Sequence, residues 1–149
     1  MSDSGVFSQL SPSLVKSLAE LSITEPTPVQ VKVIPDILAG KSLLFQSETG
    51  TGKTFAYLLP LISRLEQTEN SAQAVRVLVC APTFELASQI KEAVRSVTQM
   101  KCSLFIGGSP LKRQIDALKE KPEIVVGNPA RLLELIQLKK LKVANLAAA

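Results

Sequence analysis

Residues Ser47–Thr54 carry the strongest chemical pattern in the sequence, Ser-Glu-Thr-Gly-Thr-Gly-Lys-Thr. It matches the phosphate-loop pattern except at the first position, where Ser47 replaces glycine. The glycines at 50 and 52 let the backbone curl so that successive N–H groups point into one concavity, and the following helix adds the positive end of its dipole. We expect Lys53 to reach the β- and γ-phosphates and the Thr54 hydroxyl to bind Mg²⁺. The residues predicted to line this nucleoside triphosphate site are Ser47, Glu48, Thr49, Gly50, Thr51, Gly52, Lys53 and Thr54, with Lys53 and Thr54 in catalytic roles.

The elements around this loop favour the phosphate site over a glycine-rich turn in which Gly-Lys-Thr occurs by chance. Ser42–Gln46 is apolar and predicts a strand before the loop, and a helix is expected from Lys53 to about Gln67. Two earlier helices are predicted to begin at Pro12 and Pro28, after the N-caps Ser11 and Thr27, and Gly40 is expected to end the second.

Strands and helices alternate along the rest of the chain. The predicted strands are Val75–Cys80, Cys102–Ile106 and Glu123–Val126, and the predicted helices are Glu85–Val97, Pro110–Lys119 and Pro129–Gln137, with Asn128 as the last N-cap. Short, continuously apolar strands separated by helices are typical of a parallel sheet covered on both faces. The sequence therefore predicts an α/β fold with a three-layer, doubly wound parallel sheet.

Length, composition and charge narrow the class of protein. The chain has 149 residues, about one domain, with 46% apolar and 20% charged residues, which excludes wholesale disorder. Residues 101–149 carry nine Lys and Arg against four Asp and Glu, a balance that suits an anionic partner such as nucleic acid, unless these lysines are simply solvated. Six aromatic residues and no Trp argue against a base-stacking surface, so phosphates are the expected contact.

Cysteine usage and the N-terminal sequence indicate an intracellular setting, and we expect the protein to be cytoplasmic. Cys80 and Cys102 lie in apolar segments and are interpreted as reduced core residues, rather than a disulfide or metal pair. There is no His, so a zinc site is not expected. Nothing at the start of the chain resembles a secretion signal, and no apolar run approaches the roughly 20 residues of a membrane span.

Four further motifs lie in order around the phosphate loop: Glu25–Gln30 (Glu-Pro-Thr-Pro-Val-Gln), Pro82–Ala87 (Pro-Thr-Phe-Glu-Leu-Ala), Gly107-Gly108 and Asn128–Arg131 (Asn-Pro-Ala-Arg). Together they resemble the first RecA-like domain of DEAD-box ATP-dependent RNA helicases, from about Phe7 to Asn145. The resemblance implies a RecA-like fold, ATP and Mg²⁺ as cofactors, and RNA as a partner.

The resemblance assigns the nucleotide base to residues upstream of the loop. It implies that the Gln30 carboxamide reads the adenine edge, since an amide offers the one donor and one acceptor that adenine requires. Pro26 and Thr27 belong to the same motif. In the family an upstream aromatic stacks on the base; Phe7 is the candidate, and simple core packing is the alternative for it.

The resemblance also assigns RNA backbone contacts to segments that follow strands. The residues implied are Pro82, Thr83, Gly107, Gly108, Asn128, Pro129 and Arg131. They lie just after the carboxyl ends of strands, where ligands bind in open α/β sheets. The sequence departs from the family at Phe84, where Arg is usual, at Asn128, where Thr is usual, and at Ala130, where Gly is usual; these departures put RNA affinity in doubt more than nucleotide binding.

No Asp-Glu-Ala-Asp segment occurs in this sequence, so the carboxylates that hold Mg²⁺ and orient the attacking water are missing. We interpret residues 1–24 as an N-terminal extension and first helix, 25–145 as a partial RecA-like domain, and 146–149 as an uninformative tail. The chain is expected to bind nucleotide without hydrolysing ATP or unwinding RNA, and to need the second RecA-like domain of a longer protein. The alternatives are a non-catalytic nucleotide- or partner-binding module and a small-molecule kinase, although the phosphoacceptor groups and arginine-rich lid of a kinase are not evident.

Overall fold

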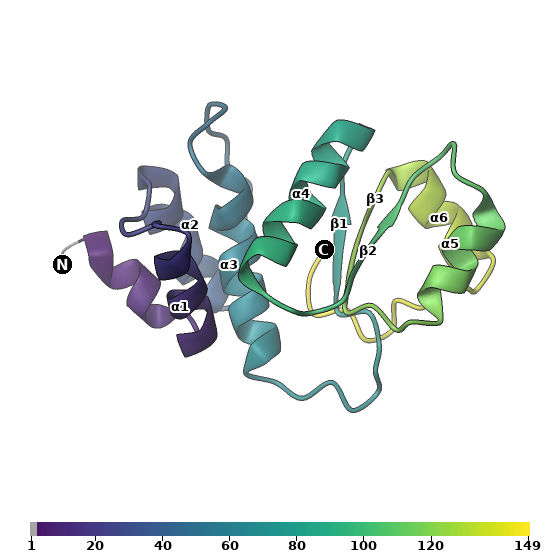
Figure 1. Cartoon of the computed structure of the whole chain (residues 1–149), viewed down its shortest axis with the longest axis horizontal. Coiled ribbons are helices and arrows are strands. Elements are labelled where there is room, and N and C mark those ends of the chain that lie inside the picture. The colour runs from purple at the N-terminus through teal and green to yellow at the C-terminus, as the bar shows by residue number, and fades with distance from the viewer. Residues whose placement is uncertain (1–2) are drawn as a thin grey trace. The chain divides into compact units, whose positions relative to one another are not determined.

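The computed structural model of the protein describes residues 3–149 (Figure 1). It contains two compact units. The first comprises the chain up to Glu69 together with Ser96–Thr98, and the second comprises Asn70–Arg95 and Gln99–Ala149. Each unit is described by itself.

The first unit is helical, and its α-helices begin and end close to the residues that the sequence predicts. Its elements are the 3₁₀ helix η1 (Asp3–Gln9) and the helices α1 (Pro12–Glu20), α2 (Pro28–Leu38) and α3 (Lys53–Glu66). Thr27 caps α2 as predicted, and Gly40 follows the helix with a φ of 81°. Ser11 occupies the predicted N-cap of α1 but makes no side-chain cap bond, and its hydroxyl donates to Glu66 at the end of α3. The core between α2 and α3 is formed by Val33, Ile37 and Ala56, with Phe45 packed against it.

The predicted strand at Ser42–Gln46 is wrong. No residue of this segment is assigned to a strand, and Leu44 is fully exposed. A strand needs a hydrogen-bonded neighbour, and none of the described residues pairs with this segment. An apolar run reports side chains that favour burial, but it does not reveal whether a neighbouring strand is present.

The second unit has the predicted alternation of strands and helices. Its elements are β1 (Val77–Cys80), α4 (Phe84–Val97), β2 (Cys102–Phe105), α5 (Leu111–Leu118), β3 (Ile124–Gly127) and α6 (Pro129–Gln137). The strands form a parallel sheet in the order β1-β3-β2, with Val77 and Cys102 both opposite Ile124. In Figure 1, α4 lies on one side of the sheet and α5 and α6 lie on the other. The α/β fold with three layers is confirmed.

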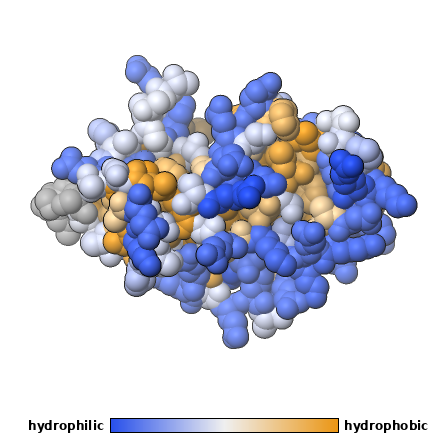
Figure 2. All heavy atoms as spheres, viewed as in Figure 1, coloured by the Kyte–Doolittle hydropathy of each residue, from blue (hydrophilic) through white to orange (hydrophobic). Residues whose placement is uncertain are grey.

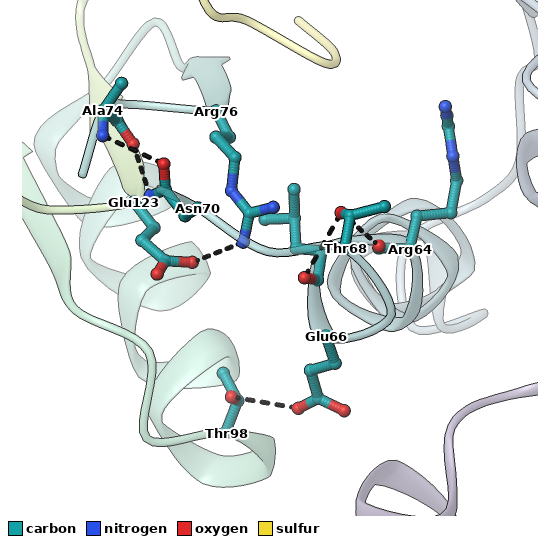
Figure 3. Close-up of polar contacts among 9 residues, drawn as sticks. Arg64, Glu66, Thr68, Asn70, Ala74, Arg76, Thr98 and Glu123 are labelled. Atoms are coloured by element: carbon teal, nitrogen blue, oxygen red, sulfur yellow. Dashed lines mark hydrogen bonds and ion pairs between the residues drawn. The ribbon is translucent and has the colours of Figure 1, made fainter. Parts of the chain in front are cut away.

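Apolar residues pack this sheet against its helices, and one ion pair joins two of its strands. Phe105, Val125, Leu132 and Leu135 are buried together between the sheet and helices α5 and α6. At the start of the sheet, Arg76 Nη2 lies 2.9 Å from Glu123 Oε2, so the pair joins the residues that precede β1 and β3 (Figure 3). Because the Arg76 side chain is only 10% exposed, this pair is shielded from water more than the surface pairs of the chain.

Two features at the edge of β1 differ from the sequence-based interpretation. The tail beyond Asn145 has structure: Ala147 and Ala148 donate to the Arg76 carbonyl, and Leu78 donates to the Ala148 carbonyl, which makes a short parallel bridge to β1. Cys80, interpreted as a core residue, is exposed at the end of β1, and both cysteines are free. The interpretation of Cys80 failed because an apolar strand at a sheet edge keeps its last residues accessible.

Surface hydropathy shows no broad apolar face in the view drawn. Apolar side chains form separate patches among polar ones (Figure 2). No helix among residues 3–149 has both the length and the apolar character that a membrane crossing requires.

Candidate functional site

The segment Ser47–Thr54 forms a curled turn that leads directly into α3. Gly50 and Gly52 have φ angles of 79° and 82°, in the left-handed region that glycine adopts without strain. Gly52 is the N-cap of α3 and has no side chain to cap it, so the first N–H groups of the helix keep no side-chain acceptor at this position. A Cβ added at Gly50 would have no neighbouring atom within 4 Å, so the space beside this glycine is open. The first N–H groups of α3 thus lack a side-chain cap beside an open glycine turn, an arrangement that suits an anion.

Polar side chains brace the same turn. The Ser47 and Thr51 hydroxyls are hydrogen-bonded, and the Thr51 hydroxyl also donates to the Glu48 carbonyl at 2.6 Å. The Lys53 ammonium donates to the Ser47 carbonyl at 2.6 Å and so bridges the two ends of the loop. A phosphate entering the loop would compete for this ammonium as a stronger, charged acceptor.

Thr54 lies in the first turn of α3, and Tyr57 follows three residues later in the same helix. Burial raises the pKa of Tyr57, an effect that the nearby Thr54 side chain partly offsets. Tyr57 therefore stays neutral at physiological pH. Sequence reasoning missed Tyr57, because a tyrosine one turn into a helix carries no pattern of its own.

Gln30 lies against the phosphate loop, but both ends of its carboxamide are already hydrogen-bonded to the protein. It is 3% exposed, and its Nε2 donates to the Gly52 carbonyl at 3.1 Å. Its Oε1 accepts from the Thr27 backbone N–H at 3.0 Å, while the Gln30 N–H donates to the Thr27 hydroxyl, which completes a capping box at the start of α2. The side chain thus ties the start of α2 to the N-cap of α3.

The remaining predicted nucleotide residues belong to the same unit. Pro26 is half-buried, one residue before the capping box. Phe7 is only 7% exposed and belongs to the apolar core, the alternative that the sequence left open for it. Its stacking on a base stays a prediction.

The predicted RNA-contacting residues all lie in the second unit, after the carboxyl ends of strands. Pro82 and Thr83 follow β1 and are exposed, and the Thr83 hydroxyl accepts from the Leu86 N–H at 3.2 Å, in the first turn of α4. Phe84 is 55% exposed beside them. An exposed helix start of this kind offers backbone donors to a phosphate.

Two neighbouring strands, β2 and β3, end in the other predicted RNA segments. Gly107 and Gly108 are exposed, and the second has a φ of 92°. Asn128 caps α6 as predicted, with its Oδ1 accepting from the Arg131 N–H at 3.1 Å, and Pro129 occupies the first turn. A Cβ at position 107 would lie 3.6 Å from Asn128 Nδ2, so the glycine loop and the α6 cap are close together.

The Arg131 side chain points into the protein rather than to solvent. Its Nη1 donates to the Ser109 carbonyl at 3.1 Å and to Gln114 Oε1 at 2.8 Å, and its Nε lies 3.1 Å from Glu134 Oε2. Gln114 was missed by sequence reasoning, because a single polar residue in an amphipathic helix is usually solvated. The guanidinium of Arg131 therefore already has protein partners.

Comparison with known families agrees with this arrangement of loops. Residues 27–147 match the family model described as DEAD/DEAH box helicase. The chain belongs to the DEAD/DEAH box helicase family. The resemblance that the ordered motifs indicated is therefore confirmed, and the three-stranded parallel sheet is part of a RecA-like helicase domain.

Bacterial relatives of this helicase family cover most of the chain. The chain is 42% identical over 136 residues to the DEAD-box ATP-dependent RNA helicase CshC of Bacillus cereus. The aligned region covers 89% of this chain and 34% of the relative. It is 39% identical over 141 residues to the DEAD-box ATP-dependent RNA helicase CshB of Bacillus subtilis, covering 91% and 32%, and 43% identical over 136 residues to the ATP-dependent RNA helicase CshA of Listeria monocytogenes, covering 89% and 26%. The chain thus spans about a third or less of the length of these relatives.

Proposed function

We propose that this chain is the ATP- and RNA-backbone-binding part of a DEAD-box ATP-dependent RNA helicase. In this proposal the first unit binds the nucleotide and the second unit binds RNA. The longer protein would couple ATP hydrolysis to RNA unwinding, with a second RecA-like domain supplying the rest of both sites. We place it in the cytoplasm.

One observation carries the nucleotide site: left-handed Gly50 and Gly52 lead into α3, whose N-cap has no side chain to satisfy the first N–H groups of the helix. Amide donors at the positive end of a helix dipole are the preferred partners of a phosphate chain. Lys53 lies next to them and adds a positive charge that a phosphate can attract, since the loop carbonyl that it now contacts is a weaker acceptor than a phosphate.

Magnesium fits the same place through Thr54. A hydroxyl oxygen is a ligand that Mg²⁺ accepts, and in phosphate-loop proteins the ion completes its shell with phosphate oxygens and water. When bound, the ion neutralises charge on the phosphates.

Adenine selection is assigned to Gln30, with a qualification that the hydrogen bonds impose. Its Nε2 already donates to the Gly52 carbonyl and its Oε1 already accepts from Thr27, so a base would share these atoms or displace one partner. The amide oxygen has a second lone pair and the amide nitrogen a second hydrogen, so one further bond at each atom is available. Gln30 would then connect the base to the phosphate loop.

RNA binding is assigned to the loops after β1, β2 and β3: Pro82, Thr83, Gly107, Gly108, Asn128, Pro129 and the start of α6. Exposed glycines and exposed helix starts present backbone N–H groups, which contact phosphates without reading bases. The expected binding is therefore independent of RNA sequence.

Catalysis is not assigned to this chain by itself. Its sequence contains no Asp-Glu-Ala-Asp segment. Within the predicted loop motif, residues 47–54, Glu48 is the only carboxylate residue. We expect nucleotide binding without measurable hydrolysis. Steady-state release of phosphate above that of a Lys53→Ala control would contradict this expectation.

Calorimetric titration with Mg·ATP tests the nucleotide site. We expect binding in the high-micromolar range or weaker, and we expect Lys53→Ala to abolish it, because the charge that faces the β- and γ-phosphates is removed. Unchanged affinity in Lys53→Ala would refute the phosphate-loop assignment.

A series of ligands on the unsubstituted chain tests Gln30 separately. ATP, inosine triphosphate and inorganic triphosphate carry the same phosphates, but only ATP has the exocyclic amine of adenine. We expect ATP to bind about tenfold more tightly than inosine triphosphate, equivalent to about 1.4 kcal/mol. Gln30→Ala should reduce this preference, and equal affinities for ATP and inosine triphosphate in the unsubstituted chain would remove the adenine role.

A further inference from the structure

The loop between β2 and α5, residues 106–110, is connected to a neighbouring helix by buried polar side chains. Gln114 of α5 is 5% exposed, and its Nε2 donates to the Ile106 carbonyl at 2.8 Å. Its Oε1 accepts from Arg131 Nη1 at 2.8 Å, and the same Nη1 donates to the Ser109 carbonyl at 3.1 Å. These three bonds hold both ends of the loop.

Arg131 is held in place from its own helix as well. Its Nε lies 3.1 Å from Glu134 Oε2, one turn along α6, and its side chain is 13% exposed. Its backbone N–H donates to the Asn128 side chain at the N-cap. A guanidinium suits this position because its planar fork of donors reaches several fixed acceptors at once, which the single ammonium of lysine does not.

Between the two ends that this network holds, Gly107 and Gly108 are exposed. A loop with two adjacent glycines loses more conformational entropy on ordering than other sequences do, and binding to a mobile loop must supply that free energy. A loop that is already ordered keeps more of its contact energy as affinity. The hydrogen bonds of Gln114 and Arg131 therefore order this loop in advance, so that less free energy is lost when a ligand binds it.

We infer that Gln114 and Arg131 are positioning residues for the Gly107-Gly108 loop, and that Arg131 acts on RNA through this loop rather than through a phosphate contact of its guanidinium. The inference rests on the proposed function, in which this loop contacts the RNA backbone. It assigns to Gln114 a role in RNA binding although its side chain is buried and carries no charge.

The test compares the unsubstituted chain with Gln114→Met and Arg131→Lys. Gln114→Met keeps the length of the side chain and removes both hydrogen-bonding ends, and Arg131→Lys keeps the charge and removes the fork. Arg113→Lys is the matched control, since Arg113 is exposed next to Gln114 on α5.

Two measurements are made on each variant. Fluorescence anisotropy with a ten-nucleotide uridine RNA gives the affinity at several salt concentrations, and amide hydrogen exchange gives the protection of the loop. We expect Gln114→Met and Arg131→Lys each to weaken RNA binding about tenfold, with the slope of log K against log salt unchanged, because no phosphate contact is removed. We expect amides of residues 107–109 to exchange at least about tenfold faster, while Arg113→Lys changes neither quantity.

The outcomes separate the inference from the proposed function. If Gln114→Met binds RNA as tightly as the unsubstituted chain, or if Arg131→Lys leaves both affinity and loop protection unchanged, the inference is wrong. If the unsubstituted chain binds no RNA, the proposed function fails, and the exchange rates still decide whether Gln114 and Arg131 hold the loop. A variant that loses protection throughout the second unit is unfolded, and the other variant then decides.

Discussion

Gly52→Ala tests how closely Gln30 is packed against the phosphate loop. Gly52 has a φ of 82°, and a Cβ added there would lie 2.5 Å from Gln30 Nε2 and 3.3 Å from Thr27 Cγ2. Alanine in the left-handed region costs about 1–2 kcal/mol by itself. The Gln30 amide must also move, and it then loses its 3.1 Å bond to the Gly52 carbonyl in a buried site, which costs about 1–3 kcal/mol more.

Gly50→Ala provides the matched control, because its φ of 79° is nearly the same and an added Cβ would have no neighbour within 4 Å. We expect Gly50→Ala to lower the free energy of unfolding by about 1–2 kcal/mol and Gly52→Ala by about 2–5 kcal/mol. Urea denaturation followed by circular dichroism measures both.

A second background shows whether the difference comes from Gln30. In Gln30→Ala the nearest neighbour of an added Cβ is removed and only the milder contact with Thr27 remains, so Gly52→Ala should then cost about 1–2 kcal/mol, close to the cost of Gly50→Ala. Equal costs for Gly50→Ala and Gly52→Ala in the unsubstituted background would refute the close approach of Gln30 to the loop.

Three further predictions concern the second unit. Phe84→Arg should strengthen RNA binding and steepen its salt slope by about one, as read by anisotropy, because it adds one cation for a phosphate; no change in either would mean that this segment does not meet RNA. Burial raises the pKa of the Cys102 thiol to about 11, with smaller opposing effects of nearby cations, so the folded chain keeps a proton that the unfolded chain releases above pH 9. The free energy of unfolding should therefore fall by at most about 3 kcal/mol as the pH rises from about 9 to 11, and the fall should be smaller in Cys102→Val. Mass spectrometry after iodoacetamide treatment at about pH 9 should find the exposed Cys80 modified before Cys102. Glu123→Gln should lower the free energy of unfolding by about 1–3 kcal/mol, because it removes the charged partner of the nearly buried Arg76; a loss below about 0.5 kcal/mol in urea would place this pair with exposed ones.

The elements that local sequence determines were predictable. Helix α6 begins and ends where its N-cap, proline and apolar spacing predict, since these signals act within one or two turns. The curled loop at Gly50 and Gly52 followed from the same kind of local chemistry, because left-handed backbone there needs glycine. The order of motifs then identified the family without any knowledge of contacts.

What depended on distant partners could not be predicted. Ser42–Gln46 is apolar like a strand, yet a strand exists only where a neighbour pairs with it, and that neighbour is not encoded in the segment. The hydrogen bonds of Gln30 to Gly52 and of Arg131 to Gln114 join residues far apart in sequence. A sequence motif indicates which residue types could bind a ligand. It does not reveal whether those side chains are already hydrogen-bonded within the protein.

The most direct test of the central claim is a titration of the ¹⁵N-labelled chain with Mg·ADP, followed by two-dimensional nuclear magnetic resonance. If the loop binds the phosphates, the largest shifts should occur at the amides of Gly50, Gly52 and Thr54, with the Gln30 side-chain amide shifting in the same titration. If ADP saturates the chain while these amides keep their positions, the loop is not a nucleotide site and the account fails.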